Sequence, residues 1–365
     1  MSIKKLKILD ALKTVTDPTT GQDIVRMKKV EELKICGDNI TFNLLTTSLK
    51  SEEKEALNFA CISAIQSLYP QANVLVNMVQ QFANPLHEEG SLPHIKNIIA
   101  VASGKGGVGK STVAVNLALG LQRLGAKVGL VDADLYGPSI PTMLGLRGER
   151  PKIKEIYGKP RILPLEAFGI PLMSIGFIIQ PEQAVVLRGP RLAGIIKQFF
   201  NDVLWPPLDY LIVDLPPGTG DIQLTLVQTV AVTGAIIVTT PQEVAVADAI
   251  KAMNMFLLPN LDVPILGVVE NMSWFTPKEL PQNKYFIFGE GGGEKLAKTG
   301  NTVLLGQIPI VQGIRESGDE GQPVVTEKNS LSAKAFMEVV EMVARQVAVR
   351  NETLSPTQIV KITTP

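Results

Sequence analysis

The segment SGKGGVGKST at residues 103–112 constrains the fold more than any other part of the sequence. It contains the pattern G-x-x-x-x-G-K-[ST], formed by Gly104, Gly109, Lys110 and Ser111. The apolar run NIIAVA at 97–102 precedes this segment, and the helical pattern TVAVNLALGLQRLG at 112–125 follows it. A buried strand, a glycine loop and a helix in this order bring several backbone N–H groups together at a helix N-terminus, where phosphates bind.

The glycine loop predicts a nucleotide site in which each residue type has a physical reason. Glycine lets the backbone approach phosphate closely and adopt positive φ angles. Lys110 is expected to reach the β- and γ-phosphates, and the Ser111 hydroxyl is expected to bind Mg²⁺. The full set of expected phosphate contacts is Gly104, Lys105, Gly106, Gly107, Val108, Gly109, Lys110, Ser111 and Thr112.

Further short apolar runs follow the loop, and each is succeeded by a turn and a helical pattern. They are KVGLVDAD at 127–134, YLIVDLPPG at 210–218, AIIVTTP at 235–241, ILGVVENM at 265–272 and VLLGQIPI at 303–310. Fully buried strands that alternate with helices are typical of a parallel sheet covered on both faces. The predicted fold class is therefore α/β, with a doubly wound, mainly parallel P-loop NTPase sheet.

Polar residues end several of these predicted strands, where ligands of open α/β sheets bind. Asp132 and Asp134 can orient an attacking water or hold Mg²⁺, and Asp214 has the position of a Walker B aspartate that holds Mg²⁺. Gly218 follows at a spacing where its backbone N–H could sense the γ-phosphate, which would make residues 216–221 a switch loop. Asn271 offers a donor and an acceptor to the adenine edge, but a structural turn asparagine explains it equally well.

The first 82 residues predict a separate small α+β domain with the order α, β, β, α, β. Apolar residues have helical spacing near the N-terminus, and they alternate at 33–44 around a Gly-Asp-Asn turn, which indicates a β-hairpin. Residues 83–94 lose this periodicity and contain two prolines, so they are interpreted as a linker. The ATPase domain is expected at 95–350, followed by a polar, mobile tail at 351–365.

Composition excludes several classes of protein. The 365 residues contain 35 Lys plus Arg and 35 Asp plus Glu, so no excess charge favours nucleic acid or an anionic membrane as a partner. Cys36 and Cys61 are the only cysteines, which excludes a disulfide framework, and both are expected to be reduced thiols. The N-terminus lacks the apolar region of a signal peptide, and no apolar run reaches the length of a membrane span. The expected location is the cytoplasm.

The motifs together resemble a known family. KGGVGKST is similar to the deviant Walker A sequence of MinD/ParA-like P-loop ATPases, which is marked by a second lysine, here Lys105. In this order, VDADLYGPS, RGP, VDLPPGTGD, TTPQEVAVADA, VENM and IPI resemble the Mrp/ApbC group of that superfamily. The first 80 residues look like the small iron–sulfur assembly domain that often precedes Mrp proteins, so the resemblance covers nearly the whole chain.

The resemblance implies an ATP-dependent iron–sulfur cluster carrier that works as a homodimer and serves apo-proteins or scaffold proteins. It implies that Lys105 reaches the partner subunit's nucleotide, while Lys110 serves the phosphates of its own subunit. It further implies Ser111 and Asp214 as the Mg²⁺ residues, Asp134 as the residue that orients the hydrolytic water, and Asn271 as an adenine contact.

One departure from the family affects the cargo. A Cys-x-x-Cys usually follows the ENM sequence and supplies thiolates to a cluster shared by two subunits, but residues 273–293 contain no cysteine. Three interpretations follow. The chain binds a cluster through Cys36 or Cys61 with a partner's ligands, it assists while another protein holds the cluster, or it is an ATP-driven switch without cluster chemistry.

Other features leave alternatives open. His87 and His94 flank the linker and are a weak metal hypothesis, and GEGGGEKLA at 289–297 is either an anion site or a turn that opens a helix. Arg188 and Arg191 are either dimer contacts or structural arginines. The alternative functions are a ParA/MinD-like positioning ATPase and a nucleotide-dependent adaptor that binds no cluster.

Overall fold

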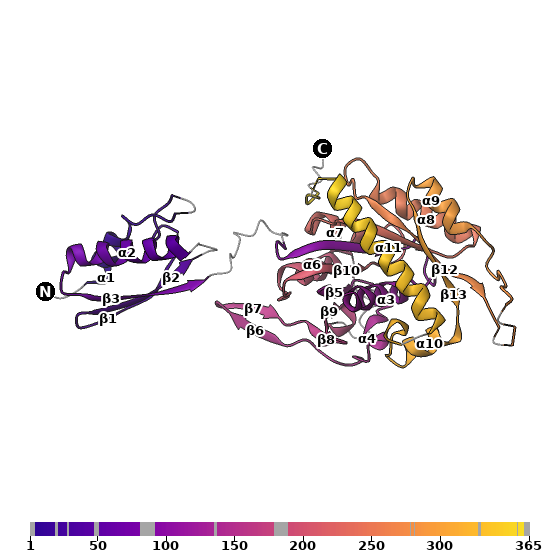
Figure 1. Cartoon of the computed structure of the whole chain (residues 1–365), viewed down its shortest axis with the longest axis horizontal. Helices are drawn as coiled ribbons and strands as arrows, with labels where there is room; N and C mark the ends of the chain where they lie inside the picture. The colour runs from indigo at the N-terminus through magenta and orange to yellow at the C-terminus, as the bar shows by residue number, and fades with distance from the viewer. Residues whose placement is uncertain are drawn as a thin grey trace. The chain divides into compact units, whose positions relative to one another are not determined.

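The computed structural model divides into two compact units, Met1–Glu88 and Glu89–Pro365, and each is described here by itself (Figure 1). The residues that the structure describes are 4–18, 21–27, 29–46, 51–80, 92–134, 137–178, 189–277, 279–280, 282–327, 330–355 and 357–360. Most of the predicted linker at 83–94 lies outside these ranges.

The small unit has the predicted element order. Its elements are α1 (Lys5–Leu12), β1 (Val30–Cys36), β2 (Asn39–Thr46), α2 (Ser51–Leu68) and β3 (Asn73–Gln80). The strands β1 and β2 form the expected antiparallel hairpin, and β2 pairs with β3 in parallel. The parallel pair needs a crossover connection, which α2 supplies.

One face of the small sheet carries the core of this unit. Ile40, Phe42 and Leu44 alternate along β2 and are buried, as the period-two pattern predicted. Ile8 and Leu12 of α1 and Cys61 and Ile65 of α2 complete this core. Cys61 is thus a core side chain, whereas Cys36 at the end of β1 is exposed.

The large unit is built on an eight-stranded sheet with the order β13-β12-β11-β4-β10-β5-β9-β8. Its strands are β4 (Ile95–Ala102), β5 (Val128–Asp132), β8 (Leu165–Ala167), β9 (Ile170–Ser174), β10 (Leu208–Asp214), β11 (Gly234–Thr239), β12 (Ile265–Phe275) and β13 (Leu304–Ile310). All neighbouring pairs are parallel except β8 with β9. The predicted fold class is confirmed.

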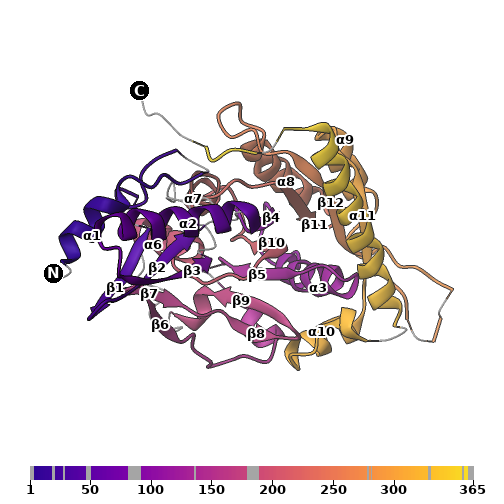
Figure 2. The ribbon, with the colours of Figure 1, turned by 60° about the vertical axis from the view of Figure 1, so that its left-hand side comes forward.

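Helices cover both faces of this sheet. They are α3 (Lys110–Arg123), α4 (Ile140–Met143), α6 (Gly189–Asn201), α7 (Asp221–Thr229), α8 (Glu243–Phe256), α9 (Gly292–Thr299), α10 (Gln312–Asp319) and α11 (Leu331–Thr353), with short 3₁₀ turns at Ile175–Phe177 and Val324–Thr326. Figures 1 and 2 show α3 and α11 side by side on one face, with α6 and α7 on the other.

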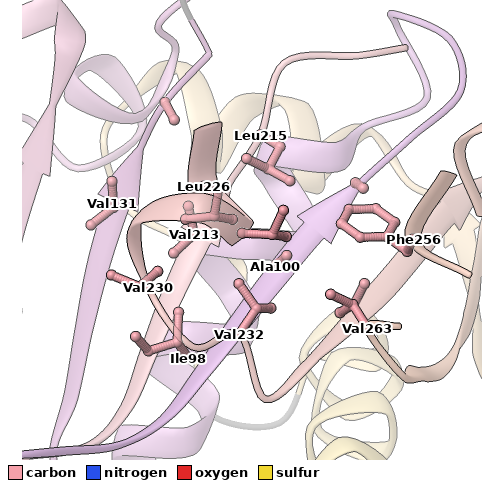
Figure 3. Close-up of a cluster of buried hydrophobic side chains, with 14 of the residues drawn as sticks. Ile98, Ala100, Val131, Val213, Leu215, Leu226, Val230, Val232, Phe256 and Val263 are labelled. Atoms are coloured by element: carbon pink, nitrogen blue, oxygen red, sulfur yellow. The ribbon is translucent and has the colours of Figure 1, made fainter. Parts of the chain in front are cut away.

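The central strand β4 shows why the sequence gives this two-sided arrangement. Ile98, Ala100 and Ala102 join the core under α6 and α7, while Ile99 and Val101 join the core under α3 and α11. Figure 3 shows part of the first core, where Ile98 and Ala100 lie near Val213 of β10. A strand buried on both faces has no polar alternation, which explains its continuous apolar run.

The region between β5 and α6 contains elements that the sequence analysis did not predict. The strands β6 (Ile153–Ile156) and β7 (Lys159–Ile162) form a separate antiparallel hairpin, and β8 and β9 extend the main sheet. These four strands are three to five residues long, and two of them contain proline, so their sequence signal is weak.

The C-terminal helix α11 runs three residues past the predicted boundary at 350 and ends at Thr353. Among the described residues beyond it, Ser355 and Val360 make hydrogen bonds to the large unit, and the mobility expected of this tail stays a prediction. The Arg350 guanidinium donates to the Ser355 carbonyl oxygen at 2.8 Å, and the backbone N–H of Val360 donates to the Val227 carbonyl oxygen at 3.1 Å. Among the described helices, none has the length and apolar character needed to cross a bilayer.

Candidate nucleotide site

The glycine loop joins β4 to α3 as the sequence predicted. Gly107 and Gly109 have φ angles of 83° and 81°, in the left-handed region that glycine tolerates best. Gly104 is required for a different reason, because a Cβ there would lie 2.0 Å from the backbone carbon of Asp248 in α8. The loop is therefore shaped partly by its own turns and partly by close packing against α8.

The loop lines a cavity of about 380 Å³. Its lining residues are Ser103, Lys105, Gly106, Gly107, Gly109, Lys110, Ser111, Thr112, Asp134, Gly137, Ser139, Met143 and Pro217. Seven of the nine residues that the sequence assigned to phosphate binding are in this set. The cavity thus combines a glycine backbone, a helix N-terminus and a buried lysine, which is the arrangement that a polyphosphate requires.

The Lys110 ammonium joins the ends of two neighbouring strands. Its Nζ lies 2.7 Å from Oδ1 of Asp214 and 3.2 Å from Oδ2 of Asp134. The Ser111 hydroxyl donates to Oδ2 of Asp214 at 2.5 Å. Burial alone would lower the pKa of Lys110, but Asp214 and Asp134 outweigh this effect and raise it. Lys110 therefore stays protonated.

Asp132 occupies a different place from Asp134, although the two are only two residues apart. It is fully buried behind the cavity, where its Oδ2 accepts from the Ser174 hydroxyl at 2.8 Å and its Oδ1 accepts from the Asp134 backbone N–H at 3.1 Å. Burial, and then the charge of Asp214, raise the pKa of Asp132 to about 8. Asp132 thus positions Asp134 and does not line the cavity.

The predicted switch loop after β10 is fixed by backbone contacts. The Gly218 N–H, which was expected to sense the γ-phosphate, donates to the Ser103 carbonyl oxygen at 2.8 Å. The Gln223 amide donates to the carbonyl oxygens of Pro216 and Gly218 at 2.9 and 3.0 Å. Neither Gln223 nor Ser174 belongs to a recognisable motif, so the sequence alone gives no signal for either residue.

The Asn271 side chain supports the glycine loop by a hydrogen bond to its backbone. Its amide Nδ2 donates to the Val108 carbonyl oxygen at 2.8 Å, and its Oδ1 accepts from the Met272 backbone N–H at 2.9 Å. A Cβ on Gly109 would lie 2.1 Å from this Nδ2 atom. The side chain is nearly buried. The adenine contact expected for Asn271 stays a prediction beside this structural role.

Lys105, the second lysine of the loop, differs from Lys110 in its surroundings. Lys110 is buried, whereas Lys105 is exposed on the cavity wall. Within the described part of the chain, its ammonium makes no hydrogen bond or ion pair. A long cation held at the mouth of a phosphate cavity is free to meet a group from outside the chain.

The GEGGGEKLA segment forms the turn that opens α9, which was one of its two interpretations. The backbone N–H of Gly293 donates to Oε2 of Glu270 at 2.6 Å, and the Gln307 amide donates to Oε1 at 2.7 Å. A carboxylate from this chain therefore occupies the helix N-terminus. Glu270 is almost fully buried and links β12, β13 and α9 at the strand end that carries Asn271.

The hypotheses for the histidines, arginines and cysteines have less structural evidence. His87, Arg188 and the side chain of Arg191 lie outside the described residues. Burial raises the pKa of the Cys61 thiol to about 12. No three His, Cys, Asp or Glu side chains in the ranges given above lie together as a metal site.

The residues fit a nucleotide with Mg²⁺. A Cβ on Gly107 would meet nothing within 4 Å and one on Gly106 only the Pro217 side chain at 3.8 Å, so a phosphate can approach the loop backbone closely. Ser111 and Asp214 provide adjacent oxygen atoms, and Mg²⁺ in such sites usually takes one or two protein oxygens plus phosphate and water. The fold and the site together define a P-loop NTPase with a second lysine in its glycine loop.

Comparison with known proteins identifies the family. Residues 94–344 match the family described as NUBPL iron-transfer P-loop NTPase, and residues 5–76 match the iron–sulfur cluster assembly protein family. The chain belongs to the NUBPL iron-transfer P-loop NTPase family, with an iron–sulfur assembly domain in front.

Two relatives illustrate how far the similarity extends. The iron–sulfur cluster carrier protein of Synechocystis sp. is 44% identical over 344 residues, which cover 93% of this chain and 97% of the relative. The protein of the same name from Escherichia coli K12 is 47% identical over 261 residues, which cover 71% of this chain and 69% of that protein. The sequence-based assignment to the Mrp/ApbC group is confirmed.

Two solved structures resemble the large unit. A nucleotide-binding protein from Archaeoglobus fulgidus in complex with ADP is 37% identical, with a TM-score of 0.56, and the match covers 66% of this chain and 95% of that chain. The septum site-determining protein MinD from Pyrococcus horikoshii, complexed with Mg-ADP, is 24% identical with a TM-score of 0.52, covering 70% and 99%. The second likeness shows the fold alone.

Proposed function

We propose that this chain is a Mg²⁺-dependent ATPase that acts as a homodimer and serves the maturation of iron–sulfur proteins as a carrier or assembly factor. The observation that carries the ATPase part is the contact of Lys110 with both Asp134 and Asp214 beside a glycine-lined cavity. The maturation part is supported by relatives named iron–sulfur cluster carrier protein that align over nearly the whole chain.

In this proposal the residues of one subunit hold and orient the nucleotide. The backbone N–H groups of the glycine loop and the Lys110 ammonium bind the phosphates, and Ser111 and Asp214 hold Mg²⁺. Mg²⁺ supplies positive charge that neutralises the developing charge on the phosphate oxygens. Asp134, which lines the cavity, orients the attacking water and accepts its proton.

We assign separate roles to the switch loop and to Lys105. The Gly218 N–H exchanges the Ser103 carbonyl oxygen for the γ-phosphate, so the loop has one arrangement with the γ-phosphate and another without it. Lys105 of one subunit extends into the site of the other and stabilises charge there. Hydrolysis then depends on dimerisation, which couples ATP turnover to the delivery or release of a client.

This chain offers few thiolate ligands for an iron–sulfur cluster, since it contains two cysteines. Cys61 is buried in the core of the small unit with a pKa raised to about 12, so it is a poor source of thiolate at neutral pH. Cys36 is the exposed thiol. One thiolate per subunit does not complete a cluster that requires four. We therefore place at least some of the ligands on a scaffold or client protein.

Two measurements test the proposal. Hydrolysis of ATP by the full chain should require Mg²⁺ and should be lost in Lys110→Ala. Anaerobic incubation with iron and sulfide should leave little iron on the chain alone, and addition of an apo-ferredoxin with a cluster donor should give faster cluster transfer when the chain and ATP are present. Transfer at the same rate without the chain, or equally fast with Lys110→Ala, would contradict the maturation role.

A further inference from the structure

The β6–β7 hairpin is attached to the large unit at its base and exposed at its far end. Figures 1 and 2 show it projecting from the side of the large unit that carries β8 and β9. At the base, the Ile162 N–H donates to the Asp202 carbonyl oxygen at 2.9 Å, and the Leu204 N–H donates to the Ile162 carbonyl oxygen at 2.9 Å. These bonds fix the hairpin to the segment that follows α6, so its far end is presented at a defined place.

The turn at the far end contains an unusual residue. Ile156 pairs with Lys159, so Tyr157 and Gly158 form a two-residue loop, and their φ angles are 52° and 72°. Positive φ at both positions is typical of a type I′ turn, whose first position favours Asn, Asp or Gly. A bulky residue is strained there, yet the Tyr157 side chain is 82% exposed and packs little within the chain. Strain that the chain's own packing does not explain is a sign of contact with another molecule.

The hairpin and the residues just before it are strongly basic. Residues 147–161 contain six Lys or Arg and two Glu, although the whole chain has a formal net charge of zero. The six cations are Arg147, Arg150, Lys152, Lys154, Lys159 and Arg161. Within the part of the chain that the structure describes, Arg161 is the one cation of this set with an ion pair, 3.6 Å from Oδ1 of Asp202. The other five are exposed and available to a negatively charged partner.

Three of these cations share one face of the hairpin. Lys154 lies directly opposite Arg161, and Lys159 lies opposite Ile156. Residues directly opposite one another project from the same face, and successive residues along a strand alternate. Lys154, Lys159 and Arg161 therefore project together. Like charges directly opposite one another destabilise a strand pair, so Lys154, like Tyr157, lowers the stability of the hairpin.

We infer that the β6–β7 hairpin is the docking surface for an acidic protein, which places carboxylates against Lys154 and Lys159 and receives Tyr157 in an apolar hollow. This inference rests on the proposed function, in which the acidic protein is a client or scaffold that supplies cluster ligands. The opposite face of the hairpin carries Ile153 and Glu155. A protein can contact the basic face and Tyr157 alone, whereas a nucleic acid or an anionic membrane that surrounds the turn would also meet Glu155.

The experiment measures binding of the full chain to an apo-ferredoxin chosen for its acidic surface, by isothermal titration calorimetry at low and high salt. The variants are Tyr157→Asn and Lys154→Glu/Lys159→Glu. The matched control is Lys298→Glu/Lys334→Glu, which makes the same change of net charge at two exposed lysines elsewhere on the large unit. Binding of a fluorescent ATP analogue reports that every variant is folded.

We expect the wild type and the control to bind apo-ferredoxin, with an affinity that falls as salt rises. Each hairpin variant should raise the dissociation constant by about tenfold or more. Thermal unfolding separates docking from a structural role. Tyr157→Asn suits the turn better, and Lys154→Glu places opposite charges across from Arg161, so both hairpin variants should melt at the wild-type temperature or above it.

Four outcomes would contradict one of the two claims. Hairpin variants that bind apo-ferredoxin like the wild type, or a wild type that does not bind it, would overturn the inference. Displacement of apo-ferredoxin by an equal mass of duplex DNA or of anionic lipid vesicles would assign the surface to another class of partner and overturn it too. These results leave ATP hydrolysis and cluster transfer by the wild type untouched. A wild type that docks apo-ferredoxin through the hairpin but neither hydrolyses ATP nor speeds cluster transfer would overturn the proposed function instead.

Discussion

The Nζ atom of Lys110 lies 2.7 Å from Oδ1 of Asp214, and both side chains are almost completely buried. The glycine-loop lysine and the acid at the end of β10 therefore neutralise one another at the base of the phosphate cavity. In the proposed site, a bound phosphate would compete with Asp214 for Lys110, and Mg²⁺ would give Asp214 a replacement cation. The proposed function therefore requires the nucleotide and Mg²⁺ together.

Removing the lysine and removing the neighbouring acid should have different effects. Lys110→Ala deletes a phosphate contact and leaves Asp214 buried without its cation, so nucleotide affinity should fall about 100-fold and folding stability should also decrease. Asp134→Asn keeps the size of the side chain and removes the proton acceptor, so nucleotide binding should persist while turnover falls by about 100-fold or more. Equilibrium binding and steady-state hydrolysis distinguish the two. Equal loss of binding in both variants would contradict these roles.

The buried Asp132 should make folding stability depend on pH. Its pKa is raised to about 8 in the folded state from an ordinary value of 3.8, so the folded state binds the additional proton between these values. The contribution of Asp132 to the free energy of unfolding is fully present below about pH 4. As the pH rises to about 8, this contribution is lost at about 1.4 kcal/mol per pH unit. Asp132→Asn mimics the protonated acid and should show a flatter stability curve from pH 6 to 8.

The matched control for this experiment is Asp209→Asn. A hydrogen bond from Lys96 lowers the pKa of Asp209. The contribution of Asp209 to the free energy of unfolding is therefore present at neutral pH and is lost only as the pH falls through the acid range. Urea unfolding at several pH values measures both variants. A curve for Asp132→Asn that parallels the wild type between pH 6 and 8 would show that Asp132 is ionised in the folded protein.

Two glycines of the loop should respond differently to alanine. Gly109 has a φ angle of 81°, and a Cβ would lie 2.1 Å from the Asn271 amide nitrogen. Gly109→Ala should therefore destabilise the protein by about 2 kcal/mol or more and weaken nucleotide binding. Gly106→Ala is the control, because a Cβ there lies no closer than 3.8 Å to the Pro217 side chain. Thermal unfolding measures both, and similar melting temperatures would contradict the bracing role of Asn271.

The two thiols should differ in reactivity. Cys61 is buried and its pKa is raised to about 12, while Cys36 is exposed. A thiol-specific chromogenic reagent at pH 8 should therefore modify one cysteine per native chain and two per unfolded chain. Cys36→Ser should abolish the native reaction and leave iron uptake unchanged. Rapid modification of two thiols in the native state would place Cys61 at the surface and reopen it as a cluster ligand.

Much of the fold could be predicted because its signals are local. The long apolar runs of β4, β10 and β12 are buried on both faces, and the glycine loop connects the first of them to a helix. The hairpin β8–β9 was not predicted, since its strands have three and five residues and Pro171 interrupts the second. Short strands at the edge of a sheet depend on tertiary contacts more than on their own sequence.

The site shows the same division between local pattern and tertiary contact. Strand-end motifs predicted that Asp132, Asp134 and Asp214 lie where ligands bind, because parallel strands end at one edge of the sheet. In the structure, Asp134 and Asp214 both contact Lys110. The motifs did not separate the buried Asp132 from Asp134 on the cavity wall, or indicate that Ser174 donates to Asp132. These facts depend on how β9 packs beside β5, more than 35 residues further along the chain.

In the proposed dimer, each active site uses Lys110 and Asp134 from one subunit and Lys105 from the other. Lys105→Ala and Asp134→Asn should each be inactive in steady-state hydrolysis, while both still bind ATP. In a heterodimer of the two variants, one site has an intact Asp134 and receives Lys105 from its neighbour. An equimolar mixture should therefore recover about a quarter of the wild-type hydrolysis rate. A mixture that stays as inactive as its components would contradict a shared site.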